Sequence, residues 1–373
     1  MARYNRNMTD DERKAYRKKK RLIRKIQVYS EIAIISLLII VSAGLIITHF
    51  SGNKDKLSVA KEETKKESLE TASKEEDSGL KVSAKADEPE PAETVEEEET
   101  PKAATYSAKE NDNTVNIEGD VVSQNAVLIN NQTKEIVATR GAHDKIVPAS
   151  MTKVLTVLTA ANHISKEQLN EVVTMSHEAT DYSYAGGGST SGFVEGEEVT
   201  VKDLFYGTIL PSGGDAAAEL AMYVAGDIDS FVAMMNEEVA ALGLTDSHFT
   251  NPVGFHNEDH YSTPYDISII MMAALDNEIC KEVLSTKVYN STGTNVNPEG
   301  ITISNWFLRK IEDKDIGGEI EGAKTGFVNE SGNCAVSSMI SASGTEYICC
   351  TTNSTSGWRC IYDHVAIYKS YAK

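Results

Sequence analysis

Cysteine is scarce in this sequence, and the few cysteines present all lie late in the chain. There are five in 373 residues, and the first is Cys280. An odd number leaves at least one thiol unpaired, and the spacing fits neither a zinc site nor a redox motif. The adjacent Cys349 and Cys350 would point to opposite faces of a strand, so at most one of them is expected to face the core. We therefore interpret the cysteines as small packing residues, with room for one disulfide if the protein lies outside the cell.

Positive charge is also in short supply beyond the N-terminus. The formal net charge is −20, with 36 Lys and Arg against 56 Asp and Glu. Recognition of phosphate needs a basic face, so this balance argues against nucleic-acid binding by the folded part. The exception is residues 1–31, where Arg and Lys are crowded between Arg13 and Lys25.

Large apolar residues are few between residues 51 and 114. The composition there is mainly Glu, Lys, Ser, Ala, Thr and Pro, with an acidic block at residues 96–99. Such a segment cannot form a core, so we expect it to be disordered. It would act as a flexible acidic linker that holds a domain away from a surface.

A single long apolar run lies between these two charged stretches. Residues 32–50 contain no charged side chain, and they are long enough to cross a hydrocarbon core of about 30 Å. The basic residues before the run predict a cytoplasmic N-terminus and an outward-facing remainder. A cleaved signal peptide is the alternative, but no small-x-small cleavage site follows. We therefore expect an uncleaved signal anchor in the cell membrane, because a buried core helix would not have such charged flanks.

Residues 115–373 carry the patterns of one folded domain. Two strands come first, helices fill the middle, and three strands and a closing helix end the chain, which predicts an α+β fold with one antiparallel sheet of about five strands flanked by helices. No internal repeat is evident. Strands are expected at residues 125–129, 135–138, 323–328, 334–340 and 347–352, and helices after Ser150, from about Lys202, and at 216–224, 228–242, 267–275 and 358–372.

The first candidate for chemistry is the pair Ser150 and Lys153. Three residues apart, they lie one turn apart on the same face of a helix. The apolar run at residues 154–161 predicts that this helix is buried, and burial disfavours the charged form of a lysine. A neutral Lys153 can take the proton of the Ser150 hydroxyl, which makes that serine a nucleophile.

Two later stretches form a set of three motifs with Ser150 and Lys153. Residues 210–217 place Ser212 in a turn before a helix, and residues 322–327 place Lys324, Thr325 and Gly326 on an expected edge strand. Glycine there lets a substrate approach the backbone closely. The order and spacing of the three stretches resemble the motifs of the active-site serine penicillin-recognising enzymes.

From about residue 120 onward the chain resembles the D-alanyl-D-alanine carboxypeptidases among the low-molecular-mass penicillin-binding proteins. The resemblance extends to residues 196–204, 235–236, 242–244, 249–252 and 260–263. It implies removal of the terminal D-alanine from peptidoglycan stem peptides through an ester on serine. It also implies inhibition by β-lactams and no cofactor or metal. Family members often carry a second β-rich domain and a C-terminal amphipathic anchor. Neither is expected after the closing helix of this chain, and the N-terminal anchor would take the place of the latter.

The resemblance also implies roles for individual residues. Ser150 would attack the carbonyl with Lys153 as its base, and Ser212 would pass the proton to the departing D-alanine. Lys324 and Thr325, followed by Gly326, would hold the terminal carboxylate of the substrate, and Lys324 would also lower the pKa of Lys153. The backbone N–H groups of Ser150 and Phe327 would form the oxyanion hole.

One position departs from the family. The middle motif usually has asparagine where this chain has Gly214, which leaves open a catalytically impaired protein that still binds peptide or β-lactam. A class A-like β-lactamase shares the motifs but needs a glutamate-held water, and no Glu-x-x-Leu-Asn-like segment follows Ser212. A metal-dependent peptidase at His256 and His260 is disfavoured because these residues lie in a loop, where His260 is expected to support packing.

Four further side chains receive non-catalytic interpretations. Asp215 is expected to cap a helix or pack, and Trp306 to lie in the core. Asn305 and Arg309 are candidates for the cleft wall but are not assigned to the site.

Overall fold

The computed structural model describes residues 106–373. The expected tail, membrane segment and most of the linker lie outside these residues. Within them, no helix has both the length and the apolar character that crossing a bilayer requires. Ordered contacts begin before Val115, because the N–H of Ala108 donates to the hydroxyl of Tyr265 at 3.1 Å and Lys109 pairs with Glu135.

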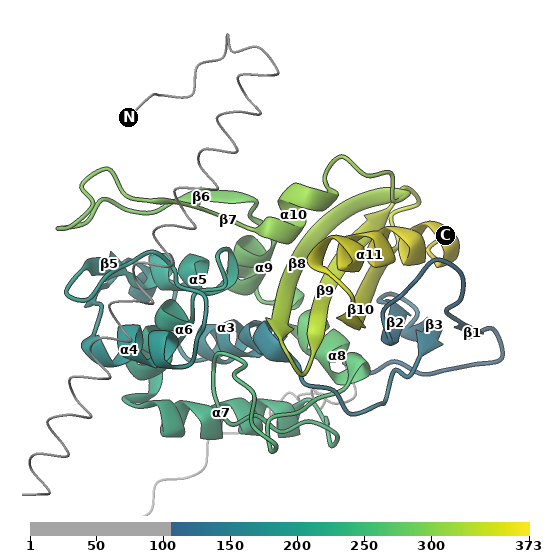
Figure 1. Ribbon diagram of the computed structural model, residues 1–373, viewed down its shortest axis with the longest axis horizontal. Helices are drawn as coiled ribbons and strands as arrows, with labels where there is room; N and C mark the ends of the chain where they lie inside the picture. The colour runs from purple at the N-terminus through teal and green to yellow at the C-terminus, as the bar shows by residue number, and fades with distance from the viewer. Residues whose placement is uncertain (1–105) are drawn as a thin grey trace, which may run out of the picture. The chain divides into compact units, whose positions relative to one another are not determined.

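A six-stranded sheet forms the centre of the fold (Figure 1). Its order is β1-β3-β2-β10-β9-β8, and every neighbouring pair is antiparallel except β1 with β3. The five expected strands are present. The expectation missed β1, which has only two residues, both exposed, and is too short to show an alternating pattern. The strands are β1 (Val115–Asn116), β2 (Asn125–Asn130), β3 (Glu135–Arg140), β8 (Gly318–Val328), β9 (Gly332–Ser341) and β10 (Glu346–Ser354).

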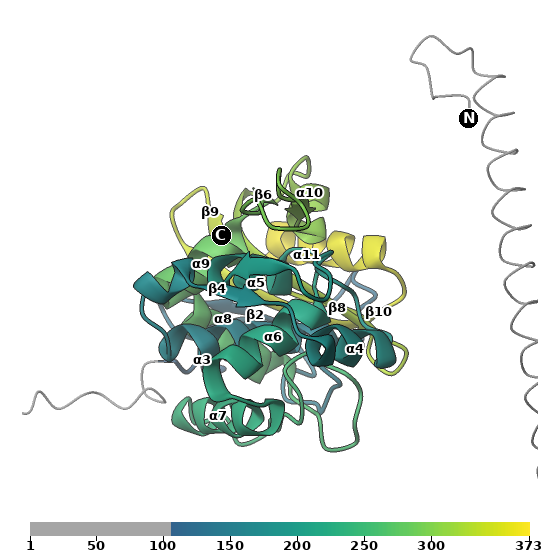
Figure 2. The same cartoon turned by 90° about the vertical axis from the view of Figure 1, so that its left-hand side faces the viewer.

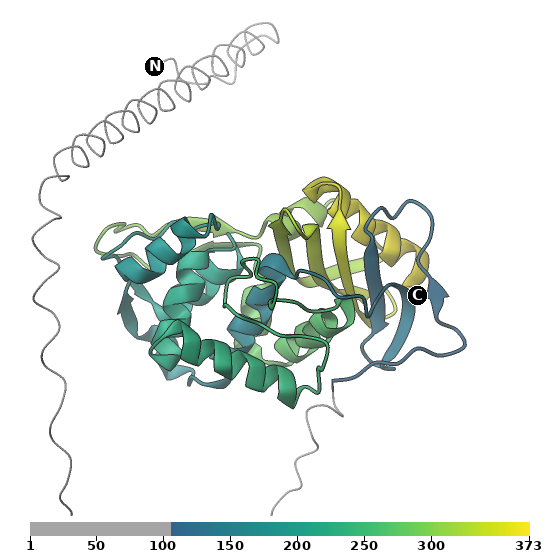
Figure 3. The same cartoon turned by 60° about the horizontal axis from the view of Figure 1, so that its bottom comes forward.

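Both faces of the sheet are covered by helices. On β2, Val127 faces the core shared with α3 (Thr152–Asn162) and α8 (Pro264–Asp276), and Leu128 faces the core shared with α10 (Trp306–Ile311) and α11 (Gly357–Tyr371). Figures 1 and 3 show α11 lying across its face of the sheet.

The covering of both faces corrects the expectation for the paired cysteines. Cys349 and Cys350 do point to opposite faces of β10, but each side chain is completely buried in one of the two cores. All five cysteines are free and buried, which confirms that they are packing residues.

The other helices form a second region beside the sheet, and α3 is shared between the two. It packs against α5 (Val201–Ile209), α6 (Gly214–Ala225) and α7 (Ile228–Ala241) as well as against α8 (Figure 2). The expected helix start before α8 is confirmed, since Thr263 Oγ1 accepts the N–H of Asp266 at 3.0 Å and Pro264 is the first helical residue. The other elements are η1 (Ala149–Met151), η2 (Glu167–Asn170), α4 (His177–Ala185) and α9 (Glu278–Ser285), with the small pairs β4 (Val172–Thr174) with β5 (Glu198–Thr200), and β6 (Val288–Asn290) with β7 (Thr302–Ser304).

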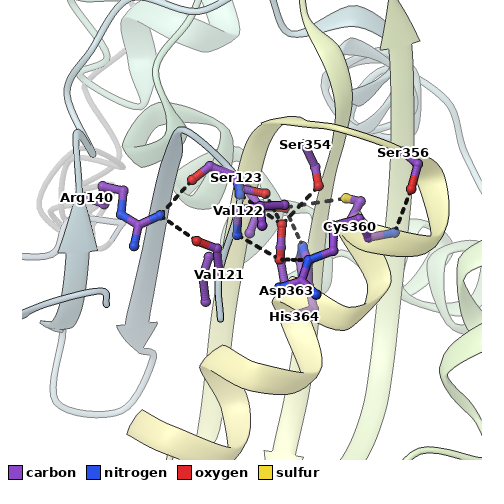
Figure 4. A network of polar contacts seen from close by, with 11 residues as sticks. Val121, Val122, Ser123, Arg140, Ser354, Ser356, Cys360, Asp363 and His364 are labelled. Atoms are coloured by element: carbon purple, nitrogen blue, oxygen red, sulfur yellow. Dashed lines mark hydrogen bonds and ion pairs between the residues drawn. The ribbon is translucent and has the colours of Figure 1, made fainter. Parts of the chain in front are cut away.

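A buried carboxylate fixes the beginning of α11. Asp363 is fully buried and accepts hydrogen bonds from the N–H groups of Val122 and Ser123, at 3.1 and 3.0 Å. The hydroxyl of Ser354 donates to it at 2.9 Å (Figure 4). The Nε atom of Arg359, one turn earlier in the helix, lies 3.3 Å from its carboxylate. These contacts join α11 to the end of β10 and to the segment between β1 and β2.

Candidate active site

The nucleophile candidate lies where the chain enters the buried helix α3. Ser150 is in the short turn η1, directly after Ala149, whose φ of 46° is unusual for a residue with a side chain. Such backbone strain is typical of functional sites. The Nζ atom of Lys153 lies 3.0 Å from Ser150 Oγ, so the expected serine–lysine pair is formed.

The surroundings of Lys153 favour a neutral amine. Its side chain is 1% exposed, and burial is the main reason why its pKa lies well below the ordinary value. The charge of Lys324 lowers this pKa further, and Asp215 opposes the shift. The amine donates to the carbonyl oxygen of Val253 at 2.8 Å. A neutral amine held in this way keeps its lone pair for the hydroxyl of Ser150.

The second and third motifs contact each other at the cleft that Ser150 also lines. Ser212 lies in the turn between α5 and α6 with a φ of 64°. The Nζ atom of Lys324, on the edge strand β8, donates to Ser212 Oγ and to the carbonyl oxygen of Thr325, both at 2.8 Å. Burial lowers the pKa of Lys324 to about 7.

The strand β8 passes very close to the nucleophile. A Cβ atom on Gly326 would lie 2.9 Å from the backbone nitrogen of Ser150 and 2.8 Å from Cys334 Sγ. Glycine is therefore required here by space. The oxyanion-hole role of the Ser150 and Phe327 N–H groups stays a prediction, although both residues line the same cleft.

These residues surround one cleft of about 480 Å³. Ser150, Lys153, Ser212, Thr325 and Gly326 all line it. In the part of the chain that the structure describes, no Asp or Glu lines this cleft. Positive charge comes from Lys324, which donates to Ser212 of the cleft wall, and this suits a substrate that ends in a carboxylate.

The turn at residues 251–255, which no motif marks as part of the site, holds the base in place. Asn251 Oδ1 accepts the N–H groups of Val253, Gly254 and Phe255, at 3.1, 2.7 and 3.0 Å. This arrangement presents the Val253 carbonyl to Lys153. A Cβ atom on Gly254 would lie 1.9 Å from the carbonyl oxygen of Ala149, so this turn packs directly against the residue before the nucleophile.

The position of Gly214 is filled by its neighbours. A Cβ atom there would lie 2.7 Å from Ser183 Oγ and 3.1 Å from Val253 Cγ1. The space that a longer side chain would need is therefore occupied. The expectation for Asp215 is confirmed, because its carboxylate packs in the interior and accepts the N–H and hydroxyl of Ser191.

The other assigned side chains divide between structural and cleft positions. Asn305 caps α10 and donates to the carbonyl oxygen of Ala323 at 2.9 Å. The expectation that Trp306 lies in the core is wrong, because it is 37% exposed and lines the cleft.

His260 supports loop packing as expected. It is buried 2.9 Å from Thr152 Oγ1, and burial lowers its pKa to about 3. The loop at residues 186–188 also lines the cleft, and its three consecutive glycines were the one available sign of it.

Residues 109–354 match the peptidase family S11, D-alanyl-D-alanine carboxypeptidase. The carboxypeptidase DacF of Bacillus subtilis is 31% identical over 219 residues, which are 58% of this chain and 54% of DacF. The chain thus aligns with about half the length of that relative. A D-alanyl-D-alanine carboxypeptidase of Streptomyces sp. strain K15 is 32% identical, over 56% of this chain and 73% of that one.

Solved structures agree with these alignments. An S216A mutant of the Streptomyces K15 DD-transpeptidase superposes with a TM-score of 0.62 and 28% identity. The superposition covers 68% of this chain and 99% of that one. The site described above is thus part of a fold shared with a DD-peptidase, and the chain belongs to the D-alanyl-D-alanine carboxypeptidase family, peptidase family S11.

Proposed function

We propose that this protein is a serine-type D-Ala-D-Ala carboxypeptidase that removes the terminal D-alanine from peptidoglycan stem peptides. The observation that carries the proposal is the meeting of a nucleophile and two buried lysines in one cleft. Lys153 lies 3.0 Å from Ser150 Oγ, and Lys324 donates to Ser212 at 2.8 Å.

Acylation begins with proton transfer from Ser150 to the neutral amine of Lys153. The serine oxygen attacks the carbonyl carbon of the penultimate D-alanine, and the N–H groups of Ser150 and Phe327 stabilise the oxyanion, each contributing about 3 kcal/mol. The hydroxyl of Ser212 delivers a proton to the departing nitrogen and is reprotonated from Lys153. The C–N bond breaks, D-alanine leaves, and an ester remains on Ser150.

Deacylation repeats these steps with water. Lys153, neutral again, takes a proton from a water molecule whose oxygen attacks the ester carbonyl. The C–O bond to Ser150 breaks, the serine recovers its proton, and the shortened peptide leaves as a carboxylate.

Selection for a chain terminus comes from Lys324 and Thr325. A protonated Lys324 and the Thr325 hydroxyl bind the terminal carboxylate through charge-assisted hydrogen bonds. An internal peptide bond offers no such carboxylate, so this contact favours a carboxypeptidase over an endopeptidase.

The same pocket accounts for β-lactam sensitivity. A β-lactam carries a carboxylate beside a strained amide, and its opening by Ser150 leaves an ester that only water can release. The opened ring stays joined to the acyl group, so its amine does not leave as D-alanine does and it hinders the water that Lys153 would activate. In residues 106–373 no carboxylate side chain lines the cleft to activate water in place of Lys153, so the ester should persist. A rapid β-lactamase is therefore the less favoured function.

We further propose that residues 32–50 anchor the protein in the cell membrane and that the catalytic domain faces the cell wall. The uncharged run and the basic residues before it support this arrangement. Resistance of the full-length protein to extraction from membranes by alkaline carbonate, with the domain open to external protease on intact spheroplasts, is the expected result. Release into the soluble fraction would contradict it.

The activity is tested by adding penicillin and a stem pentapeptide to the wild type and to Ser150→Ala. The wild type should gain one penicillin mass by intact-mass analysis and release D-alanine, and the variant should do neither. Adduct formation without D-alanine release would indicate an impaired homologue, and rapid penicillin turnover a β-lactamase. Because a structural relative is named a DD-transpeptidase, the assay also includes an amine acceptor, whose capture by the acyl group would show transfer in competition with hydrolysis.

A further inference from the structure

Three aromatic side chains form an exposed group beside the cleft. Trp306 of α10 and Trp358 and Tyr362 of α11 are 37%, 46% and 45% exposed. The ring centroids of Trp306 and Trp358 are 5.8 Å apart, and those of Trp358 and Tyr362 are 6.3 Å apart. We call this group the aromatic ledge. Exposed, contiguous aromatic surface on a soluble domain is typical of a binding site.

The aromatic ledge is continuous with the cleft through Trp306, which lines it. Gly357, at the start of α11, also lines the cleft, and a Cβ atom on it would lie 3.2 Å from the Trp306 ring and 3.5 Å from Asn333 Oδ1. Asn333 is in turn the strand partner of Phe327 on β8. The ledge therefore lies toward the end of β8 that carries Phe327.

A bound substrate would run in this direction. Its terminal carboxylate lies at Thr325 and its reacting carbonyl at Phe327 in the proposed function, so the rest of the peptide continues past Phe327. A stem peptide is joined through its N-terminus to a sugar of the glycan strand. About four residues separate the reacting carbonyl from that sugar, which corresponds to roughly 13 Å of extended chain.

The ledge is held rigidly, which keeps the ordering cost of binding low. Ser356 caps α11 by accepting the N–H of Arg359 at 3.1 Å. Asp363 fixes the next turn from the interior (Figure 4). Trp358 and Tyr362 are four residues apart on the helix and so present their rings on one face.

We propose that the aromatic ledge binds sugar rings of the glycan strand to which the stem peptide is attached. The C–H groups on the face of a pyranose ring carry partial positive charge and pack against the electron-rich face of an aromatic ring. Lys310 Nζ lies over one face of the Trp358 ring, 5.3 Å from its centroid. The amine covers part of that face and offers a hydrogen-bond donor for sugar hydroxyl or acetamido oxygens packed on the rest of the ledge. The inference rests on the proposed function and names its substrate class as glycan-linked peptide.

The kinetic test compares two substrates in the full-length protein. The measured quantity is kcat/KM for a disaccharide-linked pentapeptide divided by kcat/KM for the free pentapeptide. We expect a ratio of about ten in the wild type, comparable with the contribution of one or two aromatic contacts. Trp358→Ala should bring the ratio close to one, and Trp358→Phe should restore part of it because a ring is retained.

A matched control uses another exposed ring. Tyr184, on α4, is 82% exposed and does not line the cleft, so Tyr184→Ala should leave the ratio at the wild-type value. A ratio that is the same in wild type and Trp358→Ala would overturn the proposal. A loss of ratio in the Tyr184 variant as well would show a general effect of aromatic substitution and would also overturn it.

The binding test does not depend on turnover. Both tryptophans of the chain lie on the ledge, so intrinsic tryptophan emission reports on it alone. Titration with N-acetylglucosamine tetramer should give a saturable change in emission in the wild type and Ser150→Ala, with a Kd several-fold higher in Tyr362→Ala. No change in the wild type would refute sugar binding. Absence of D-alanine release and of a penicillin adduct would refute the proposed function instead.

Discussion

Adding a single methyl group at Gly214 should damage the site, although the family usually has a larger residue there. The new Cβ would lie 2.7 Å from Ser183 Oγ, which is fully buried and donates to the carbonyl oxygen of Ser189 at 3.0 Å. To make room, Ser183 must rotate and lose this hydrogen bond, at a cost of about 1 kcal/mol. Overpacking against Val253 adds about 1–3 kcal/mol.

The expected loss for Gly214→Ala is therefore about 2–4 kcal/mol in the free energy of unfolding, or roughly 5–10 °C in Tm. Val253 is also the residue whose carbonyl holds Lys153. Its displacement should slow acylation by a fluorescent penicillin at least tenfold, because each 1.36 kcal/mol in the barrier changes a rate tenfold. Gly214→Asn should be worse, so reinstating the family's usual residue would not raise activity.

Ser183→Ala provides the matched control. It removes the atom in the shortest contact, and the Ser189 carbonyl keeps the Gly214 N–H as a donor at 2.7 Å. The double variant Ser183→Ala/Gly214→Ala should therefore be more stable than Gly214→Ala alone. Without the clash, alanine in place of a helical glycine would stabilise the protein by up to about 1 kcal/mol. A Tm for Gly214→Ala above that of the wild type would thus show that no clash occurs and would refute the reasoning.

Three further predictions concern the lysines, the Asn251 turn and the α11 anchor. The kcat/KM for a free pentapeptide should fall as the pH rises through about 7, the lowered pKa of Lys324, because its charged form binds the carboxylate. A C-terminally amidated peptide has no terminal carboxylate, so its kcat/KM should not fall in this pH range. Asn251→Ala should slow penicillin acylation by about 10–100-fold and shift the acid limb of its pH profile, since the Val253 carbonyl no longer holds Lys153, whereas an unshifted limb would mean a purely structural role. Asp363→Ala should lower stability by about 3 kcal/mol or more. Asp315→Ala, which removes an exposed partner of Lys369, should lower it much less, as thermal unfolding would measure. Equal losses would contradict the importance given to the buried carboxylate.

The grouping of Ser150, Lys153, Ser212 and Lys324 was predictable because three motifs occur in the order and spacing of the penicillin-recognising enzymes that the chain resembles. The three motifs also sit at element boundaries that the sequence marks well. Ser212 precedes α6 and Lys324 lies on the edge strand β8, as expected. Site residues can be predicted from sequence when their side chains belong to a motif and the motif lies at a recognisable helix or strand boundary.

The parts of the site that could not be predicted act through backbone or through long-range packing. The Val253 carbonyl contacts Lys153 across 100 positions in the chain, and a carbonyl oxygen is common to every residue. Trp306 is a large apolar residue of the kind expected in a core, and only the fold places it at the cleft wall. The burial of both Cys349 and Cys350 could not be predicted for the same reason, because the covering of both sheet faces by helices depends on the whole topology.

The proposed chemistry depends on a difference between the two buried lysines, and the effect of the Lys324 charge on Lys153 explains it. Both side chains are 1% exposed, so burial alone would make both neutral. Each amine also donates to one hydroxyl and one carbonyl oxygen, so these partners do not separate them. The pKa of Lys324, about 7, leaves it partly charged at neutral pH. That remaining charge in turn lowers the pKa of Lys153. One lysine can thus attract the carboxylate because it keeps its proton, and its charge helps the other to act as a base.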